Sequence, residues 1–235
     1  DDQLDPEAIS AFLSFGYVPE NLCIFQSSTK IQPGQIITLQ TGAKQVKSER
    51  LFNLQDTVHQ PKTAASAALE PLLREVISEQ MISDVSLGCF LSGGIDSSVV
   101  ASLMQAESLT QINTYSIGFD EARFNEAPHA AAVARHLGTC HTEIMLPEKR
   151  AFDLVFDLPD IYDEPFADSS QIPTALLCRE ARKHVTVALT GDGADELFGG
   201  YNRHVFGPGL LARLNRVPMV LRKPLGALAA GLRGV

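Results

Sequence analysis

Four short apolar runs, separated by stretches with helical spacing of apolar residues, restrict the fold of this chain more than any other feature. The runs are "VSLGCFL", "TYSIGF", "HTEIML" and "VTVALT". Strands that are apolar throughout are typical of sheets covered on both faces, and strands that alternate with helices are typical of parallel sheets. The sequence therefore predicts an α/β fold with a doubly wound parallel sheet.

The first 58 residues have a different pattern. "AISAFLSFGYVP" has helical spacing and ends at a proline, and "KIQPGQIITLQTGAKQVKSE" contains two β-rich stretches beside turn residues, as in a small hairpin. Because so few residues form a poor core alone, we interpret residues 1–58 as the end of a larger domain and residues 59–235 as the α/β domain. "LQDTVHQPKT" between them is predicted to be a linker.

Charge and composition exclude several classes of protein. With 28 acidic and 19 basic residues the net charge is −9, which argues against nucleic acid as a partner. The basic segment after Arg203 is interpreted as solvated faces of short helices. The acidic N-terminus is unlike a signal peptide, and no run reaches the roughly 18 apolar residues of a membrane span.

The four cysteines are isolated in the sequence, without a C-x-x-C pair. They are Cys23, Cys89, Cys140 and Cys178. Their positions inside apolar runs predict buried free thiols in a reducing compartment, and therefore a cytoplasmic protein. The histidines of the central region lack the spacing of a helical zinc site, which favours structural roles. These are His129, His136 and His141.

The loop "SGGIDSS" after the first apolar run has the composition of an anion-binding loop. Gly93 and Gly94 permit positive φ and bring backbone N–H groups close to a ligand, while Ser97 and Ser98 open the next helix with hydroxyls and free amides. The loop lacks the lysine of a Walker A motif. The alternative is a tight strand-to-helix turn that binds nothing.

Acidic residues beside this loop and in a second loop predict a magnesium site. A carboxylate repels a polyphosphate unless a divalent cation lies between them, so Asp96 is interpreted as a Mg²⁺ ligand. The loop "GDGADELFGG" after the fourth run offers Asp192, Asp195 and Glu196 as partners. If the first and fourth strands are neighbours, both loops face one ligand. The alternative for the second loop is a solvated acidic turn.

The sequence alone does not decide the role of the segment "EPFADSSQIPT". Its polar side chains could bind substrate or could simply start the following helix. They are Glu164, Asp168, Ser169 and Ser170.

Four segments in this order resemble the synthetase domain of the glutamine-hydrolysing asparagine synthetases. They are "LSGGIDSSVVASLM", "YSIGFDEARFNEAPHAAAVARHLGTCHTEI", "YDEPFADSSQIPT" and "LTGDGADELFGGYNRH". The first contains the S-G-G-x-D-S loop of the N-type ATP pyrophosphatases, which implies a fold of the adenine nucleotide α-hydrolase type. "FLSFGYVPENLCIFQSSTKIQPGQIITL" resembles the end of that family's amino-terminal glutaminase domain, so residues 1–58 would be a remnant of the glutamine amidotransferase domain.

The resemblance implies an adenylating amide ligase. ATP would activate the side-chain carboxylate of aspartate as a β-aspartyl-adenylate with release of pyrophosphate, and ammonia from glutamine would attack to give asparagine and AMP. The missing lysine fits this chemistry, because the β- and γ-phosphates leave together and are held by amides, hydroxyls and Mg²⁺. The resemblance is also compatible with a homodimer as the full enzyme.

The same resemblance implies roles for individual residues. Pyrophosphate would be bound by Ser92, Gly93, Gly94, Ser97 and Ser98. Mg²⁺ would be bound by Asp96 and Asp195. The adenine and ribose pocket would be lined by Leu91, Ile117, Gly118 and Gly191. Asp192 would assist the attack of ammonia, with Asp195 as the second catalytic candidate. Asparagine synthetases often have glutamate at the position of Asp192, so a relative that amidates another carboxylate, in surface-polysaccharide or β-lactam synthesis, is the alternative.

The chain departs from this family in two places. Family members begin their mature chain with a nucleophilic cysteine, whereas this chain begins with Asp1 and its first cysteine, Cys23, lies in another segment. The family also supplies a catalytic lysine from a later region that has no match here. We therefore expect a fragment, truncated at its C-terminal end, that does not hydrolyse glutamine and could be an incomplete nucleotide-binding module.

Overall fold

The computed structural model describes residues 3–42, 46–52, 65–119, 125–146, 148–219 and 222. The linker predicted at residues 54–63 and the predicted boundary after residue 58 lie outside the described residues.

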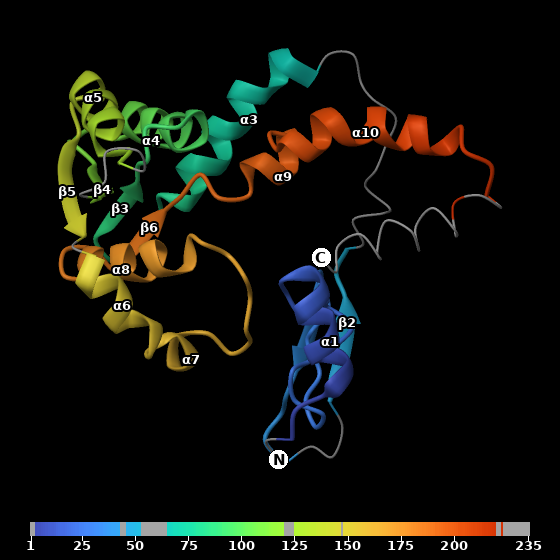
Figure 1. The fold of residues 1–235 in the computed structure, drawn as a ribbon. Coiled ribbons are helices and arrows are strands. Elements are labelled where there is room, and N and C mark those ends of the chain that lie inside the picture. Colours follow the sequence, from blue (N-terminus) through green and yellow to red (C-terminus); the bar gives the residue numbers. More distant parts are fainter. Residues whose placement is uncertain are drawn as a thin grey trace.

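A parallel four-stranded sheet forms the centre of the described α/β domain (Figure 1). Its strands are β3 (Leu87–Phe90), β4 (Asn113–Phe119), β5 (Cys140–Leu146) and β6 (Val187–Leu189). Their order is β5-β4-β3-β6, and every neighbouring pair is parallel. The predicted parallel α/β fold is confirmed, and the first and fourth predicted strands are neighbours.

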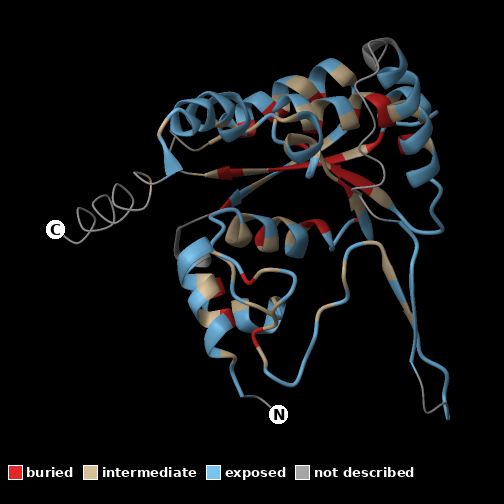
Figure 2. Cartoon of the chain, turned by 90° about the vertical axis from the view of Figure 1, so that its right-hand side faces the viewer, coloured by how far each residue is buried: buried red, intermediate tan, exposed pale blue. Residues whose placement is uncertain are grey.

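Helices cover both faces of this sheet (Figure 1). On one face lie α3 (Ala65–Gln80), α4 (Ile95–Glu107) and α5 (Ala127–Leu137); on the other lie α6 (Glu148–Val155), α7 (Leu158–Ile161) and α8 (Gln171–Ala181). Side chains alternate between the faces, so Cys89 packs with α4 and α5 while the adjacent Phe90 packs with Tyr115. Buried residues accordingly concentrate in the strands and on the inner sides of the helices (Figure 2). The sheet is doubly wound, as predicted.

The ends of α5 follow the sequence signals. The side chain of Asn125 accepts a hydrogen bond from the Ala127 amide at 3.0 Å, one residue before the assigned N-cap, Glu126. Gly138 ends the helix with a φ of +73° and donates its N–H to the carbonyl of Ala134 at 2.9 Å. The helix thus ends shortly before β5 begins at Cys140.

The described parts of residues 3–52, called here the N-terminal unit, form a separate small structure. It contains α1 (Pro6–Phe15) and the antiparallel strands β1 (Gln35–Thr38) and β2 (Lys47–Arg50), which confirms the predicted helix and hairpin. Its own core consists of Ala8, Val18 and Ile24, with apolar neighbours packed around them. In Figure 1 the unit lies beside the chain that joins α7 to α8.

Two helices follow β6 and lead away from the sheet. They are α9 (Ala194–Phe198) and α10 (Asn202–Asn215). The described basic segment after Arg203 therefore forms one helix of 14 residues rather than several short ones, and it runs through Pro208. Its exposed side chains include large apolar residues such as Phe206 and Leu210 as well as arginines. The prediction of solvated polar faces is therefore only partly correct. No helix in the described part of the chain is long and apolar enough to cross a membrane.

All four cysteines are free thiols, as predicted, but their burial was predicted wrongly. Cys89 is fully buried, and burial raises the pKa of its thiol to about 12. Cys23 is half-buried, and Cys140 and Cys178 are exposed. Cys140 begins β5, an edge strand of the sheet, and Cys178 lies at an exposed position of α8. An apolar run in a sequence does not reveal either position.

A buried polar cluster joins β4 to β5 around His141. Its ring Nδ1 lies 2.9 Å from Thr114 Oγ1 and its Nε2 lies 3.2 Å from Ser116 Oγ, while Thr114 Oγ1 also lies 2.8 Å from Thr139 Oγ1. Thr114 and Ser116 are almost completely buried. These contacts confirm the structural role predicted for His141.

We expect this cluster to make the protein less stable in mild acid. Burial lowers the pKa of His141 below its ordinary value of 6.5, so the unfolded chain takes up the proton at a higher pH than the folded one. The free energy of unfolding should therefore fall as the pH drops below about 6.5. Urea unfolding at pH 7.5 and pH 5.5 should show a smaller pH effect in His141→Gln than in the parent, whereas His136→Gln, at an exposed position, should match the parent. An equal pH effect in all three proteins would contradict this assignment.

Candidate functional site

The loop between β3 and α4 is shaped by Gly93. Its φ is +83°, and a Cβ at this position would lie 2.7 Å from the backbone nitrogen of Ala130 and 2.7 Å from the carbonyl carbon of His129. Only glycine combines this conformation with so close an approach to the first turn of α5. Gly94 has ordinary φ and forms the N-cap of α4 without a side-chain cap. The loop is therefore held against the first turn of α5.

The serines of this loop have different partners. Ser92 Oγ and Ser97 Oγ lie 2.9 Å apart, and the Gly94 amide donates to Ser92 Oγ at 3.2 Å, so these hydroxyls hold the loop in shape. Ser98 Oγ is buried and has no hydrogen-bond partner among the described residues. Buried hydroxyls are normally satisfied, so the Ser98 hydroxyl is an exception among the serines of this loop.

The loop after β6 packs directly onto the start of α4. A Cβ at Gly191 would lie 2.7 Å from the backbone nitrogen of Ser97 and 2.9 Å from the carbonyl carbon of Asp96. The absence of a side chain at Gly191 lets the two loops touch through their backbones. This contact confirms the expectation that the loops after the first and fourth strands face one place.

Two local contacts orient the acids of the second loop. The backbone N–H of Asp192 donates to Thr190 Oγ1 at 3.1 Å. Asp195 lies in the first turn of α9, and the Gly200 amide donates to its carbonyl oxygen at 3.1 Å. A Cβ at Gly200 would lie 2.0 Å from Asp195 Oδ1, so the glycine makes room for the carboxylate.

A cavity of about 1070 Å³ lies at the carboxyl ends of the strands, where the loops after β3, β4 and β6 meet α8. Eight of the predicted site residues line it, namely Leu91, Ser92, Asp96, Ser97, Ile117, Gly191, Asp192 and Asp195. Four do not line it, namely Gly93, Gly94, Ser98 and Gly118. Gly93 shapes the loop from behind, and a Cβ at Gly118 would lie 2.5 Å from Met145 Sδ, so its role is close packing against β5.

The segment Tyr162–Ser170, called here the connecting segment, joins α7 to α8 and forms another wall of the cavity. Asp168, Ser169 and Ser170, whose role the sequence left open, line the cavity. Asp168 also accepts hydrogen bonds from the amide and the hydroxyl of Ser170, both at 2.8 Å, so it starts α8 as well. These bonds lower the pKa of Asp168. Glu164 does not line the cavity.

Sequence reasoning missed several lining residues. They include Glu126, Tyr162, Phe166, Gln171, Thr174 and Tyr201. Glu126 lies at the start of the helix predicted from Asn125, in the stretch that follows a predicted strand, a position that could have identified it. Tyr162 and Phe166 form an edge-to-face pair with ring centres 4.8 Å apart, and no spacing in the sequence indicates that they turn toward the same cavity.

Carboxylates dominate the charge of the cavity wall. Among the described residues, the six that line it are Asp96, Glu126, Asp168, Asp192, Asp195 and Glu196. Glu196 accepts a hydrogen bond from the Tyr201 hydroxyl at 2.7 Å, which lowers the pKa of Glu196 and raises the pKa of Tyr201. The Arg203 guanidinium lies 4.1 Å from the centre of the Tyr201 ring. Like charges at this density disfavour one another and favour a bound cation.

The described residues do not form a complete metal cage. No group of three or more acidic, histidine or cysteine side chains within them is arranged to hold a metal ion by itself. Asp96 and Asp195 share the cavity, an arrangement that suits a cation whose other ligands come from a bound phosphate or from water.

Comparison with known proteins gives one family and several relatives. The asparagine synthase family model matches residues 68–233. Putative asparagine synthetase (glutamine-hydrolyzing) 2 of Methanocaldococcus jannaschii is 33% identical over 210 residues, which cover 88% of this chain and 40% of that protein. Asparagine synthetase (glutamine-hydrolyzing) 1 of Bacillus subtilis is 35% identical over 243 residues, which cover 100% of this chain and 37% of that protein. The chain thus spans about two-fifths of the length of these relatives. The solved NMN synthetase from Francisella tularensis aligns with a TM-score of 0.43 and 19% identity over 57% of this chain and 58% of that one.

Proposed function

Because this chain belongs to the asparagine synthase family, we propose that it is the nucleotide-binding core of an ATP-dependent amide ligase that makes asparagine. ATP converts the side-chain carboxylate of aspartate into a β-aspartyl-adenylate, pyrophosphate leaves, and ammonia, supplied from glutamine in the full-length enzyme, forms the amide. The observation that carries this proposal is the backbone contact of Gly191 with Asp96 and Ser97, because it joins a phosphate-type loop and an acidic loop in one cavity.

The loop after β3 suits a leaving pyrophosphate. Its sequence offers hydroxyls and backbone amides without a lysine, and Ser98 Oγ is buried without a partner among the described residues. The start of α4, a helix of 13 residues, adds free N–H groups and the positive end of the helix dipole. In our proposal Ser92 and Ser97 bind the β- and γ-phosphates, while Gly93 and Gly94 shape the loop. Ser98 does not line the cavity and is left out of the phosphate contacts.

We include a bound Mg²⁺ in the proposal because the wall of the cavity carries many negative charges. The six carboxylates would repel a polyphosphate, and Mg²⁺ prefers one or two carboxylates together with phosphate oxygens. We assign Asp96 and Asp195 as its ligands. A bound Mg²⁺ would neutralise the charge that collects on pyrophosphate as it leaves.

The remaining lining residues divide between nucleotide and acceptor. Leu91, Ile117 and Gly191 come from the loops and strands next to the phosphate site and would contact adenine and ribose. Asp192 would assist the attack of ammonia. The relatives are asparagine synthetases, which favours aspartate over the acceptors of polysaccharide or β-lactam synthesis. The free thiols agree with a cytoplasmic location, which is part of the proposal.

Product analysis tests the proposed function. With Mg²⁺, ATP, aspartate and ammonium, which replaces glutamine as the nitrogen source, we expect AMP, pyrophosphate and asparagine in equal amounts. Exchange of labelled pyrophosphate into ATP should require aspartate but not ammonium, because it reports adenylation alone. The same mixture with glutamate in place of aspartate is the control. ADP and phosphate as products would contradict adenylation, and nucleotide binding without pyrophosphate exchange would instead indicate a binding module.

A further inference from the structure

The connecting segment has two faces. Tyr162, Phe166 and Asp168 lie on the wall of the cavity, whereas Glu164 and Ala167 contact the N-terminal unit. The segment is the part of the α/β domain that runs closest to this unit in Figure 1. One short stretch of chain therefore belongs to the cavity and to the junction at the same time.

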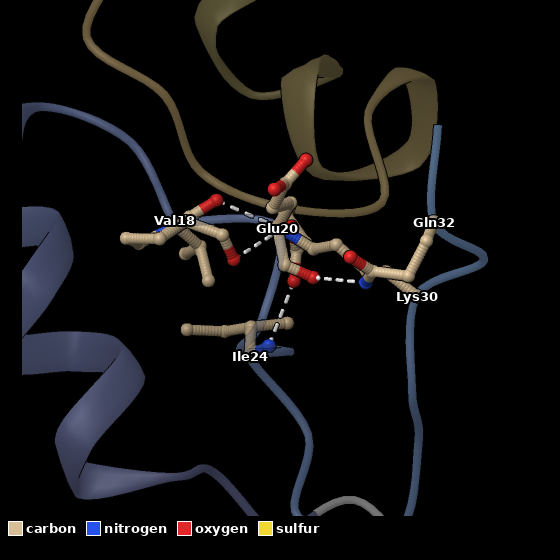
Figure 3. A network of polar contacts seen from close by, with 7 residues as sticks. Val18, Glu20, Ile24, Lys30 and Gln32 are labelled. Carbon is tan, nitrogen blue, oxygen red and sulfur yellow. Dashed lines mark hydrogen bonds and ion pairs between the residues drawn. The ribbon is translucent and has the colours of Figure 1, made fainter. Parts of the chain in front are cut away.

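Glu164 is the centre of this junction. Figure 3 shows its partners Ile24 and Lys30, together with Val18. Its Oε1 accepts a hydrogen bond from the Ile24 amide at 2.7 Å, and its Oε2 forms an ion pair with Lys30. The Lys30 ammonium also donates to the carbonyl oxygens of Val18 at 2.8 Å and Pro19 at 3.4 Å. Val18 and Ile24 are core residues of the N-terminal unit, so the carboxylate binds beside the unit's core and not to a loose end.

A second contact fixes the segment three residues further on, at Ala167. The Ala167 amide donates to the carbonyl oxygen of Gly16 at 2.6 Å. Gly16 ends α1 with a φ of +81°, and a Cβ there would lie 3.4 Å from Ala167 Cβ. The end of α1 and the connecting segment are therefore in close contact. Phe166 and Asp168, on either side of Ala167, lie between this contact and the cavity.

The ion pair between Lys30 and Glu164 is largely shielded from solvent, so it can contribute to holding the connecting segment in place. The side chains of Lys30 and Glu164 are 27% and 20% exposed. Hydrogen bonds to charged groups are stronger than neutral ones, and salt screens partly buried pairs less than exposed ones. Removing one partner would leave the other charge half-buried with fewer contacts.

We infer that Glu164 is a positioning residue through which the N-terminal unit sets the position of one wall of the cavity. It acts through Phe166 and Asp168, since it does not line the cavity itself. The identity of the ligand that contacts this wall, the acceptor carboxylate, rests on the proposed function. The loops after β3 and β6 are assigned there to the nucleotide and the metal. The connecting segment forms another wall of the same cavity, and we assign this wall to the acceptor carboxylate.

Hydrogen exchange of the intact chain tests the positioning itself. In Glu164→Gln and Lys30→Met, the amides of residues 166–170 should exchange about tenfold faster than in the parent, because a charge-assisted contact that closes the segment is lost. The double variant should exchange no faster than the single ones if the two residues act as a pair. Lys47→Met is the matched control, because Lys47 forms an exposed ion pair with Glu49 at 3.1 Å in the same unit. Unchanged exchange at residues 166–170 in both single variants would overturn the inference.

Kinetics test the acceptor assignment. In Glu164→Gln the KM for aspartate should rise about tenfold, while the KM for ATP should stay within about twofold of the parent. An equal rise in both constants would overturn the assignment of this wall to the acceptor. If the parent chain itself does not turn over, the proposed function fails, and hydrogen exchange still decides whether the N-terminal unit positions the wall.

Discussion

Replacing Gly93 with alanine is expected to lower the free energy of unfolding by about 2–5 kcal/mol. A left-handed conformation costs a residue with a side chain about 1–2 kcal/mol, and overpacking adds about 1–3 kcal/mol. The methyl group would meet backbone atoms of His129 and Ala130 at 2.7 Å, and backbone cannot move aside as a flexible side chain can. Chemical denaturation of the variant and the parent measures the difference.

Alanine variants of two other glycines separate the conformational strain from the steric overlap that together lower the stability of Gly93→Ala. Gly138 has a φ of +73° with nothing within 4 Å of an added Cβ, so Gly138→Ala should show the conformational strain alone, about 1 kcal/mol. Gly94 has ordinary φ and only Ser92 Oγ nearby, at 3.2 Å, so Gly94→Ala should change stability least. If Gly93→Ala is no worse than Gly138→Ala, the loop is not packed against α5 as the structure describes.

Replacing Asp96 with asparagine is expected to weaken binding of Mg-ATP by about a hundredfold or more, because it removes one of the two carboxylates that we assign to the metal. Asparagine keeps the size of the side chain, and relief of charge repulsion in the cavity should leave folding unharmed or slightly improved. The variant therefore separates a ligand role from a structural one. Titration calorimetry with ATP in the presence and absence of Mg²⁺ measures the effect.

An acid away from the cavity serves as the control for Asp96. Asp160 is exposed in α7, so Asp160→Asn should bind Mg-ATP as the parent does. The loss in Asp96→Asn should also disappear when ATP is titrated without Mg²⁺, because only the metal complex depends on this carboxylate. Equal affinity of Asp96→Asn and the parent for Mg-ATP would remove Asp96 from the metal site.

The strands and the two main loops could be predicted because their signals are local. Each strand is an apolar run of strand length, and a parallel order brings the loops after β3 and β6 to one end of the sheet. Gly191 was predicted to lie in the site, but its physical role, a backbone contact with α4, became visible only in the structure. The sequence thus indicated which loops meet without indicating how closely.

The rest of the site depends on contacts between distant segments. The hydrogen bond between Ile24 and Glu164 joins residues 140 positions apart, and nothing near either residue indicates it. Tyr162 and Phe166 line the cavity from a segment that also contacts the N-terminal unit through Ala167 and Gly16. Burial of Cys140 was misjudged for a similar reason, since its strand is at the edge of the sheet and a sequence does not show which strands are edges.

The contact of Gly191 with Asp96 and Ser97 also affects how fast a ligand can bind. Because the two loops already touch through their backbones, a ligand that binds in the cavity they both line need not bring them together first. No ordering entropy of these loops is then subtracted from the affinity, and association is limited by encounter and orientation rather than by loop closure. Slow steps in the catalytic cycle should therefore arise elsewhere, in the chemistry or in the release of products.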